Sequence, residues 1–373
     1  MKQQTEFHVG DKIWGACHAL VIAELGTGHG ADRTKAAELI EAAAEAGADC
    51  IKFQMVYADE ILHPNTGDVP LPGGRTPLYD RFKRLEAPVD FFADMKEMVE
   101  KKGLLFLCTP FGIQSARDVR ALNPAALKIA SPEINYTALL REIAPYNLPV
   151  FLSSGVSKLS DIEEALSTLS NIMVCLLHCV TAYPAPPREY NLRVLRSLSA
   201  VFGVPTGVSD HSMDAELVPS LAAALGAVAV EKHFCLSRKD AGLDDPIALE
   251  PKNFAVMVKA IRETEGAAAA RGTRSALEEI KCERGEELVE AILGDGVKRL
   301  AFSEEANYTR TNRSIHALCD IREGEIIARD MIACLRSEKA LRPGLPPSWE
   351  EKIVGRRAKT FIPAGEGVRF EDV

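Results

Sequence analysis

Eight short apolar runs in this chain each end in polar residues that can bind an anion, move a proton or hold a metal. The runs lie at roughly 18–25, 48–55, 104–109, 126–130, 149–154, 173–179, 204–209 and 226–233. Their last residues are Glu24, Lys52, Thr109, Lys128, Ser153 with Ser154, His178, Ser209 with His211, and Glu231 with His233. Eight such strands separated by helical patterns predict a (β/α)8 TIM barrel, whose active site lies at the carboxyl ends of its strands.

Helical patterns separate the predicted strands. Apolar residues recur at three- and four-residue spacing in segments 31–47, 89–103 and 157–170, and another helix-like stretch covers 252–270. This spacing is typical of amphipathic helices, so the strands and helices together predict a barrel domain over residues 1–271.

The last quarter of the chain has a different pattern. Segment 272–306 is charged and helix-prone, which predicts a connector. Residues 307–373 contain short alternating runs, turn signals and prolines, and therefore predict a small β-rich domain.

The gap after the second predicted strand is the longest. Residues 57–88 include the loop sequence HPNTGDVPLPGGRTP. Because this insertion leaves the carboxyl end of a strand, we expect it to lie over the barrel mouth as a lid or specificity loop. A surface excursion without a role is the alternative.

Composition narrows the class of protein. The length of 373 residues suits a barrel of about 250 residues with a small extra domain. No apolar run approaches the roughly 20 residues that span a bilayer, and the opening residues lack a signal-peptide pattern, which predicts a cytoplasmic protein without a membrane partner. The net charge of −9 without a basic cluster predicts no nucleic-acid partner.

Several cofactor and cysteine motifs are missing from the sequence. Most of the nine cysteines lie in or beside strand-like runs and none form a CxxC pair, which predicts buried thiols. The sequence GTGHG at 26–30 does not match GxGxxG, and we interpret it as a tight barrel turn. The absence of a P-loop motif likewise argues against an ATP-driven reaction.

Two histidines predict a metal site. His211 and His233 end the seventh and eighth predicted strands, and each shares the inward face of its strand with a polar residue, Ser209 or Glu231. Adjacent strands lie about 4.8 Å apart, so both rings can reach one cation and leave coordination positions open. Imidazole with oxygen ligands suits Mn²⁺, with Mg²⁺, Co²⁺ or Zn²⁺ as alternatives.

A second set of residues suits a compact dianion. The predicted strands bring two ammonium groups and several hydroxyls toward the barrel axis, from Lys52, Thr109, Lys128, Ser131 and Ser154. Such a set is what a phosphate ester requires. The alternative is that Glu24 and Glu133 pair with the lysines, since unpartnered buried lysines are costly.

The chain resembles the sialic acid synthase family, which makes N-acetylneuraminate and related nonulosonic acids. The resemblance rests on eight successive motifs: IAELGTGHG, DCIKFQ, PLYDRFKRLE, LKIASPE, LSSGVSKLSDI, LLHCVTAYPAP, GVSDHS and VEKHF. TNRSIHALCDIREGEIIARDMI resembles that family's C-terminal antifreeze-like (SAF) domain. Membership implies a (β/α)8 barrel, a divalent metal, and a carbon–carbon bond-forming condensation of phosphoenolpyruvate (PEP) with an acylamino sugar aldehyde.

The resemblance also implies roles for individual residues. PEP would be held by Lys52, Thr109, Lys128, Ser131, Ser154 and Ser209, and the metal by His211 and His233. The sugar or the attacking water would face Glu24, Glu133, Glu231, Tyr183, Thr181 and Asp244. Arg313 matches the arginine that the family's tail domain inserts into the neighbouring subunit's site, so we expect a domain-swapped homodimer.

These residue types fit the implied chemistry. The metal can polarise the aldehyde while C3 of PEP attacks it. A carboxylate, Glu133 with help from Glu24, can then stabilise the cationic centre at C2 and accept a proton from water.

The acceptor sugar stays open. The chain departs from the family pattern at Gly28, at Leu243 and at Thr181, all expected on the sugar side of the site. The acceptor is therefore N-acetylmannosamine, a diacetamido sugar or an analogue, free or phosphorylated.

Three other functions stay open on sequence alone. A 3-deoxy-ulosonate-phosphate synthase shares the barrel and PEP but leaves the tail unexplained. A Schiff-base aldolase would use Lys128 or Lys52. A sugar-binding or ice-binding protein would depend on the tail and carry an inactive barrel.

Overall fold

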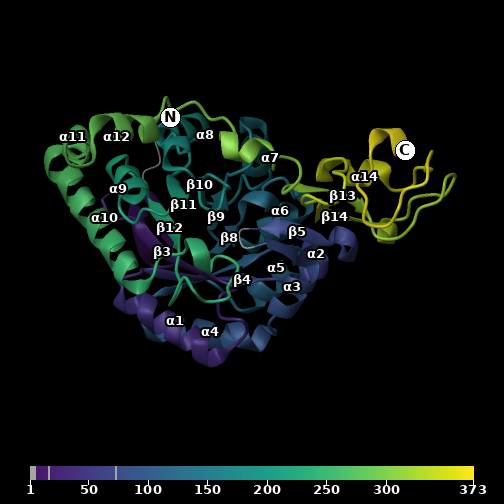
Figure 1. The fold of residues 1–373 in the computed structure, drawn as a ribbon, viewed down its shortest axis with the longest axis horizontal. Coiled ribbons are helices and arrows are strands. Elements are labelled where there is room, and N and C mark those ends of the chain that lie inside the picture. Colours follow the sequence, from purple (N-terminus) through teal and green to yellow (C-terminus); the bar gives the residue numbers. More distant parts are fainter. Residues whose placement is uncertain (1–5, 16, 72–73) are drawn as a thin grey trace.

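Eight parallel strands form a closed barrel at the centre of the larger domain (Figure 1). The computed structural model describes residues 6–15, 17–71 and 74–373. The sheet order is β7-β4-β3-β12-β11-β10-β9-β8, and the two end strands β7 and β8 pack side by side. The strands are β3 (Leu20–Gly26), β4 (Cys50–Met55), β7 (Leu105–Pro110), β8 (Leu127–Ile129), β9 (Val150–Ser153), β10 (Val174–Cys179), β11 (Thr206–Asp210) and β12 (Ala229–His233). The predicted (β/α)8 barrel is confirmed.

Helices surround the barrel as the apolar spacing predicts. In α1 (Arg33–Glu45), Asp32 caps the first turn by accepting hydrogen bonds from the amides of Thr34 and Lys35. The buried positions 36, 39, 40 and 43 form a single stripe against the strands. The other outer helices are α4 (Val89–Lys101), α5 (Ile113–Ala121), α6 (Thr137–Ile143), α7 (Leu159–Thr168), α8 (Val194–Phe202), α9 (Leu217–Ala224) and α10 (Pro251–Arg271).

An N-terminal hairpin closes the end of the barrel opposite the strand carboxyl ends. Its strands β1 (Glu6–Val9) and β2 (Lys12–Gly15) are antiparallel, and every second residue of β1 is buried. Phe7 is fully buried in the cluster formed by the first residues of the barrel strands, and its ring lies 4.7 Å from that of Phe151. The sequence patterns did not predict this hairpin.

The insertion after β4 is a folded unit. It contains α2 (Ala58–Ile61), the hairpin β5 (Asp68–Leu71) and β6 (Gly74–Pro77), and α3 (Leu78–Leu85). Ile61, Val69 and Leu78 share a small core with Phe111 of the loop after β7.

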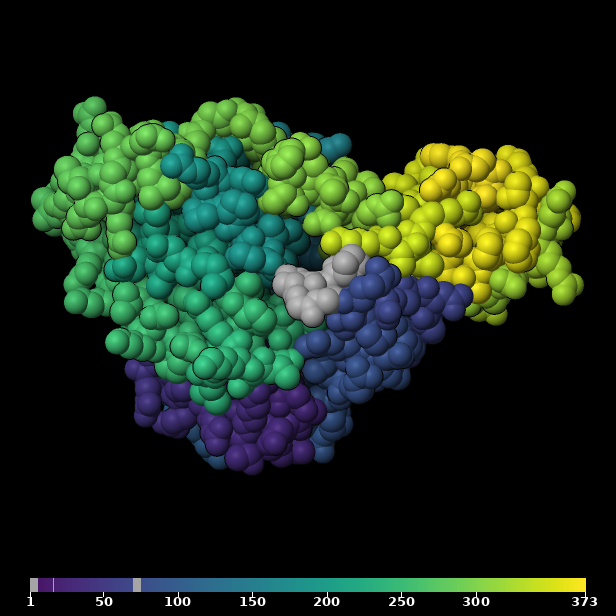
Figure 2. Space-filling model, in the orientation of Figure 1, coloured from purple at the N-terminus to yellow at the C-terminus, as the bar shows by residue number. Residues whose placement is uncertain are grey.

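The tail is a small domain with a core of its own. It contains β13 (Arg313–Ala317), β14 (Ile332–Arg336) and α14 (Glu350–Ile353) around buried residues such as Ile315 and Ile362. The tail touches the insertion (Figure 2), where His63 Nε2 lies 3.3 Å from the carbonyl of Leu318 and the side-chain amide of Asn65 donates to the carbonyl of Ala364 at 2.9 Å.

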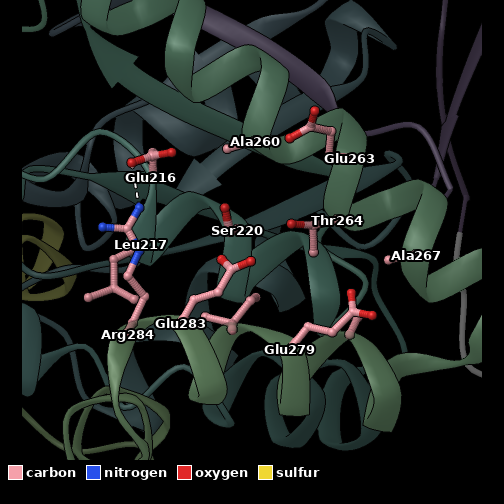
Figure 3. A pocket seen from close by; sticks show the side chains of 12 residues that line it. Glu216, Leu217, Ser220, Ala260, Glu263, Thr264, Ala267, Glu279, Glu283 and Arg284 are labelled. Carbon is pink, nitrogen blue, oxygen red and sulfur yellow. Dashed lines mark hydrogen bonds and ion pairs between the residues drawn. The ribbon is translucent and has the colours of Figure 1, made fainter.

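Between barrel and tail the chain forms three further helices: α11 (Thr273–Arg284), α12 (Glu286–Leu293) and α13 (Phe302–Glu305). Helix α11 packs on α9 and α10, and these three helices line an open pocket of about 160 Å³ (Figure 3). Its lining includes Glu263, Glu279 and Glu283, and an ion pair between Glu216 and Arg284. This pocket lies in the outer helical layer, away from the strand ends.

No helix in the described part of the chain combines the length and the apolar composition needed to cross a membrane.

The hairpin gives a test of what closes the barrel floor. Phe7→Ala is expected to lower the free energy of unfolding by about 3–5 kcal/mol, because it removes a buried ring from a packed core. Ile13→Ala, on the same hairpin but 56% exposed, should change it by no more than about 0.5 kcal/mol. Denaturant titration measures both, and equal stabilities would show that the hairpin does not seal the barrel.

Candidate active site

Glu231 is the junction of a buried charge cluster inside the barrel. Its Oε1 accepts a hydrogen bond from Ser209 Oγ at 2.9 Å and lies 3.6 Å from Lys52 Nζ and 3.5 Å from Lys128 Nζ. All four side chains are almost fully buried. Strands β4, β8, β11 and β12 therefore direct these polar groups to one point near the barrel axis.

A second carboxylate, Glu24, extends the cluster toward β3 and β4. Its Oε2 pairs with Lys52 Nζ at 2.6 Å, and its Oε1 accepts a hydrogen bond from Gln54 Nε2 at 2.6 Å. Lys52 also donates to Thr109 Oγ1 at 3.3 Å. Gln54 was not among the sequence candidates, although it lies two residues after Lys52 and so shares its inward face.

Burial and pairing pull the pKa values in this cluster in different directions. Burial raises the pKa of Glu24, and Lys52 only partly opposes that effect. Burial also acts against the charge of Glu231, but Lys128 and Lys52 outweigh it and lower its pKa to about 2. The pKa of Lys128 is lowered by burial, whereas Glu231 and Glu24 overcome burial and raise that of Lys52. An anion bound beside Lys128 would offset the cost of its charge.

The hydroxyl expected from Ser154 is directed elsewhere. Ser154 Oγ donates to the carbonyl of Leu177 on the neighbouring strand at 3.1 Å. Ser153 instead shares the inward face of β9 with Phe151, which packs in the barrel interior. The Ser153 hydroxyl is buried and has no hydrogen-bond partner among the described residues. Side-chain alternation therefore assigns the inward hydroxyl of this strand to Ser153.

Ser131 and Thr181 meet over Gly155. The amide of Gly155 donates to Ser131 Oγ at 3.0 Å, which leaves the Ser131 hydroxyl proton available to a ligand. A Cβ at position 155 would lie 2.0 Å from Thr181 Oγ1, 2.9 Å from Ser131 Oγ and 3.2 Å from Cys179 Sγ. Only glycine at position 155 lets the loops after β8, β9 and β10 approach so closely.

The two histidines lie together at the mouth. The ring centroids of His211 and His233 are 5.5 Å apart, and the ring of Tyr183 stacks on His211 at 4.4 Å. His211 Nδ1 lies 2.9 Å from the carbonyl of Val180, which orients Nε2 as the free ligand atom. His233 Nδ1 is 3.9 Å from Asp244 Oδ2.

This arrangement fits a cation held by two imidazoles. Burial lowers the pKa of His233 to about 4, so the ring is neutral at pH 7, as a ligand must be. Burial also opposes a charge on His211, but Cys179, with Sγ 3.6 Å from Nδ1, raises its pKa to about 9, so this ring carries a proton at pH 7 and must release it when a cation binds. Within residues 6–15, 17–71 and 74–373 no three histidine, cysteine or acidic side chains form a ligand group, so water or substrate oxygens would complete the coordination.

Glu133 lies outside the lysine cluster. Its Oε1 pairs with Arg313 Nη2 at 3.0 Å and Arg336 Nη2 at 2.6 Å, both from the tail of the same chain. The alternative in which Glu133 neutralises a barrel lysine therefore fails, because Glu231 neutralises Lys128. Arg313, expected to enter a neighbouring subunit, here meets the barrel of its own chain. Arg336 was missed, although it is the register partner of Arg313 in the antiparallel pair of β13 and β14.

Two side chains at the strand ends point away from the barrel axis. Lys232 pairs with Asp210 at 2.5 Å on the outer side of the barrel, as strand alternation predicts. His178 Nε2 bonds to the carbonyl of Tyr190 at 2.6 Å, so this histidine belongs to the barrel wall.

The segment before the tail also reaches the mouth. Glu304 Oε1 accepts hydrogen bonds from the amides of Val156 at 2.8 Å and Thr181 at 2.7 Å. Lys298 Nζ donates to the carbonyl of Ser154 at 2.9 Å. These residues fix the loops after β9 and β10, and no local sequence signal indicated them.

Barrel and site together define a TIM-barrel enzyme with a charged, phosphate-compatible centre and an added tail domain. The NeuB family model matches residues 39–273, and the SAF domain model matches residues 312–373. The chain belongs to the NeuB family and carries a C-terminal SAF domain.

Relatives cover nearly the whole chain. It is 33% identical to the spore coat polysaccharide biosynthesis protein SpsE of Bacillus subtilis (strain 168), over 98% of this chain and 97% of the relative. The crystal structure of SpsE superposes with a TM-score of 0.80, covering 99% of both chains at 32% identity. An N,N'-diacetyllegionaminic acid synthase of Campylobacter jejuni subsp. jejuni serotype O:2 is 32% identical over 94% of this chain and 98% of its own.

Gly155 gives a test of the close loop packing. Gly155→Ala is expected to lower turnover about 100-fold, because the new methyl group must displace Thr181 and Ser131. The double variant Gly155→Ala with Thr181→Ala should recover part of the loss, since it removes the nearest clashing atom. Steady-state kinetics measure both, and a fully active Gly155→Ala would show that these loops yield without consequence.

Proposed function

We propose that this protein condenses PEP with an acylamino sugar aldehyde and water to form a nonulosonic acid, releasing phosphate. Membership of the NeuB family defines the class of reaction. The observation that carries the proposal is the buried pair of lysines, with Nζ atoms 3.6 and 3.5 Å from the same Glu231 oxygen. Two ammonium groups at one point are suited to the dianionic phosphate of PEP.

The barrel strands supply the PEP side. Lys52 and Lys128 would hold the phosphate and stabilise it as it leaves, with hydroxyl donors from Thr109 and Ser131 around it. Ser209 donates to Glu231 and would have to exchange that bond for one to the phosphate. Ser153 is the inward serine of β9 and takes the position for which Ser154 was expected. Glu231 keeps both lysines oriented before PEP arrives.

The mouth supplies the sugar side. His211 and His233 would hold a divalent cation, Mn²⁺ by preference for mixed nitrogen and oxygen ligands, with Mg²⁺ or Co²⁺ as alternatives. When bound, this cation supplies a Lewis acid for the aldehyde oxygen. Tyr183, 40% exposed beside His211, and Asp244, near His233, are placed to contact the sugar. Thr181 contributes to the wall next to Gly155.

Carboxylates would handle the water that adds at C2 of PEP. Glu133 is the candidate base, because its Oε2 accepts no hydrogen bond from the described residues and, unlike Glu24 and Glu231, it does not pair with a lysine of the cluster. Glu24, with its pKa raised by burial, can carry a proton beside Lys52 in the same sequence of steps. The phosphate then leaves from the tetrahedral carbon toward the two lysines.

A phosphate-release assay tests the reaction. Metal-stripped protein is given PEP, Mn²⁺ and a panel of 2-acetamido and diacetamido hexoses, free and phosphorylated, with mass spectrometry of the products. We expect phosphate with at least one sugar, and a product heavier than that sugar by one pyruvate unit.

Two controls limit the interpretation of that assay. Borohydride added together with a carbonyl substrate should leave the protein mass unchanged. A covalent adduct would instead indicate a Schiff-base aldolase, a reaction to which the lowered pKa of Lys128 is also suited. No turnover together with no thermal shift on adding PEP would refute PEP as a substrate.

We also infer a cytoplasmic homodimer in which tails are exchanged, so that Arg313 meets Glu133 of the other chain through the contact seen here within one chain. Co-expression of Arg313→Ala with Glu133→Gln tests the exchange. Mixed dimers would contain one intact site, giving up to about a quarter of wild-type activity. No recovery above either single variant would mean that each tail completes the site of its own chain.

A further inference from the structure

The two tail arginines that bind Glu133 differ in their other contacts. Arg313 is 1% exposed and donates, besides its bonds to Glu133, to backbone carbonyls of Glu60, Ile61, Phe111 and Cys334. These carbonyls belong to the insertion, the loop after β7 and the tail itself. Arg313 therefore joins the tail to the barrel whether or not Glu133 is present.

Arg336 is directed at Glu133 alone. Its Nη2 and Nε donate to Glu133 Oε1 at 2.6 and 3.2 Å, and the guanidinium lies 5.4 Å from the centre of the Phe111 ring. Among the described residues, no other acceptor takes a hydrogen bond from this side chain. The residue is 9% exposed, so the pair is shielded from water and its attraction is stronger than that of a surface pair.

Both arginines bind the same oxygen. Glu133 Oε1 receives N–H groups from Arg313 and Arg336, while Oε2 is buried and accepts none from the described residues. A carboxylate anchored through one oxygen cannot rotate freely, and its second oxygen keeps a fixed direction. Such fixation is what a base or a hydrogen-bond acceptor for substrate requires.

We infer that Arg336 is a positioning residue that orients Glu133, so that Oε2 is presented to the reacting water or the acceptor sugar. The inference rests on the proposed function. It also assigns the SAF domain a part in turnover that is separate from docking, because Arg313 can hold the tail in place without Arg336.

Arg336→Met should lower kcat about 10- to 100-fold, since Glu133 loses one of its two anchors. The KM for PEP should change little, because PEP is expected at the lysine cluster. Arg336→Lys should retain more activity than Arg336→Met, and added guanidinium ion should partly restore Arg336→Ala. Arg342→Ala is the matched control, because the ion pairs of that tail arginine, with Asp372 at 2.6 Å and Glu366 at 3.8 Å, lie within the tail.

A full kcat in Arg336→Met would overturn the inference. Equal losses in the Arg336 and Arg342 variants would also overturn it, because they would indicate a general weakening of the tail.

A second measurement does not depend on activity. Melting temperatures of Arg336→Met, Glu133→Gln and the double variant should be non-additive if the two side chains interact. Additive effects would reject the pairing. A wild-type protein that releases no phosphate with non-additive melting would instead reject the proposed reaction and leave the pairing intact.

Discussion

The site depends on the attraction between Glu231 and two lysines that the barrel buries. An ammonium group without a partner is costly in an interior, and two of them repel each other. Placing Glu231 Oε1 3.6 and 3.5 Å from the two Nζ atoms offsets both penalties. The opposite pKa shifts of Lys52, raised, and Lys128, lowered, show that the compensation is unequal. The less compensated lysine is the one that gains most from a bound anion.

Parallel strand register makes this arrangement possible. Ser209 and Glu231 are register partners on β11 and β12, and His233 pairs in register with Glu24 on β3. Alternation along each strand directs these side chains inward, whereas Lys232 points outward to Asp210. Ion pairs, hydroxyls and the two histidines thus lie above an apolar floor closed by Phe7 and its neighbours.

Sequence patterns predicted the barrel, its strand ends and most of the inward residues because these features follow from local periodicity. Ser154 shows where that reasoning fails: two serines adjoin at the end of the apolar run, and only the packing of Phe151 in the barrel interior shows that Ser153 faces inward. Arg336 and Glu304 were missed because their partners are 203 and 123 residues away in the chain. No local pattern encodes such contacts, and a family resemblance indicates only the positions that its motifs cover.

The molecule divides its chemistry between the barrel and the elements added to it. Strand residues alone form the lysine cluster, which is therefore as rigid as the sheet. Tyr183 and Asp244, proposed to contact the sugar, come from loops, and Glu133, the proposed base, is held by the tail arginines. Loops and added domains can change without disturbing strand register. On the proposed function, reaction type depends on the barrel and acceptor choice on the loops and the tail. The departures at Gly28, Leu243 and Thr181, expected on the sugar side, would then bear on the acceptor and not on the reaction.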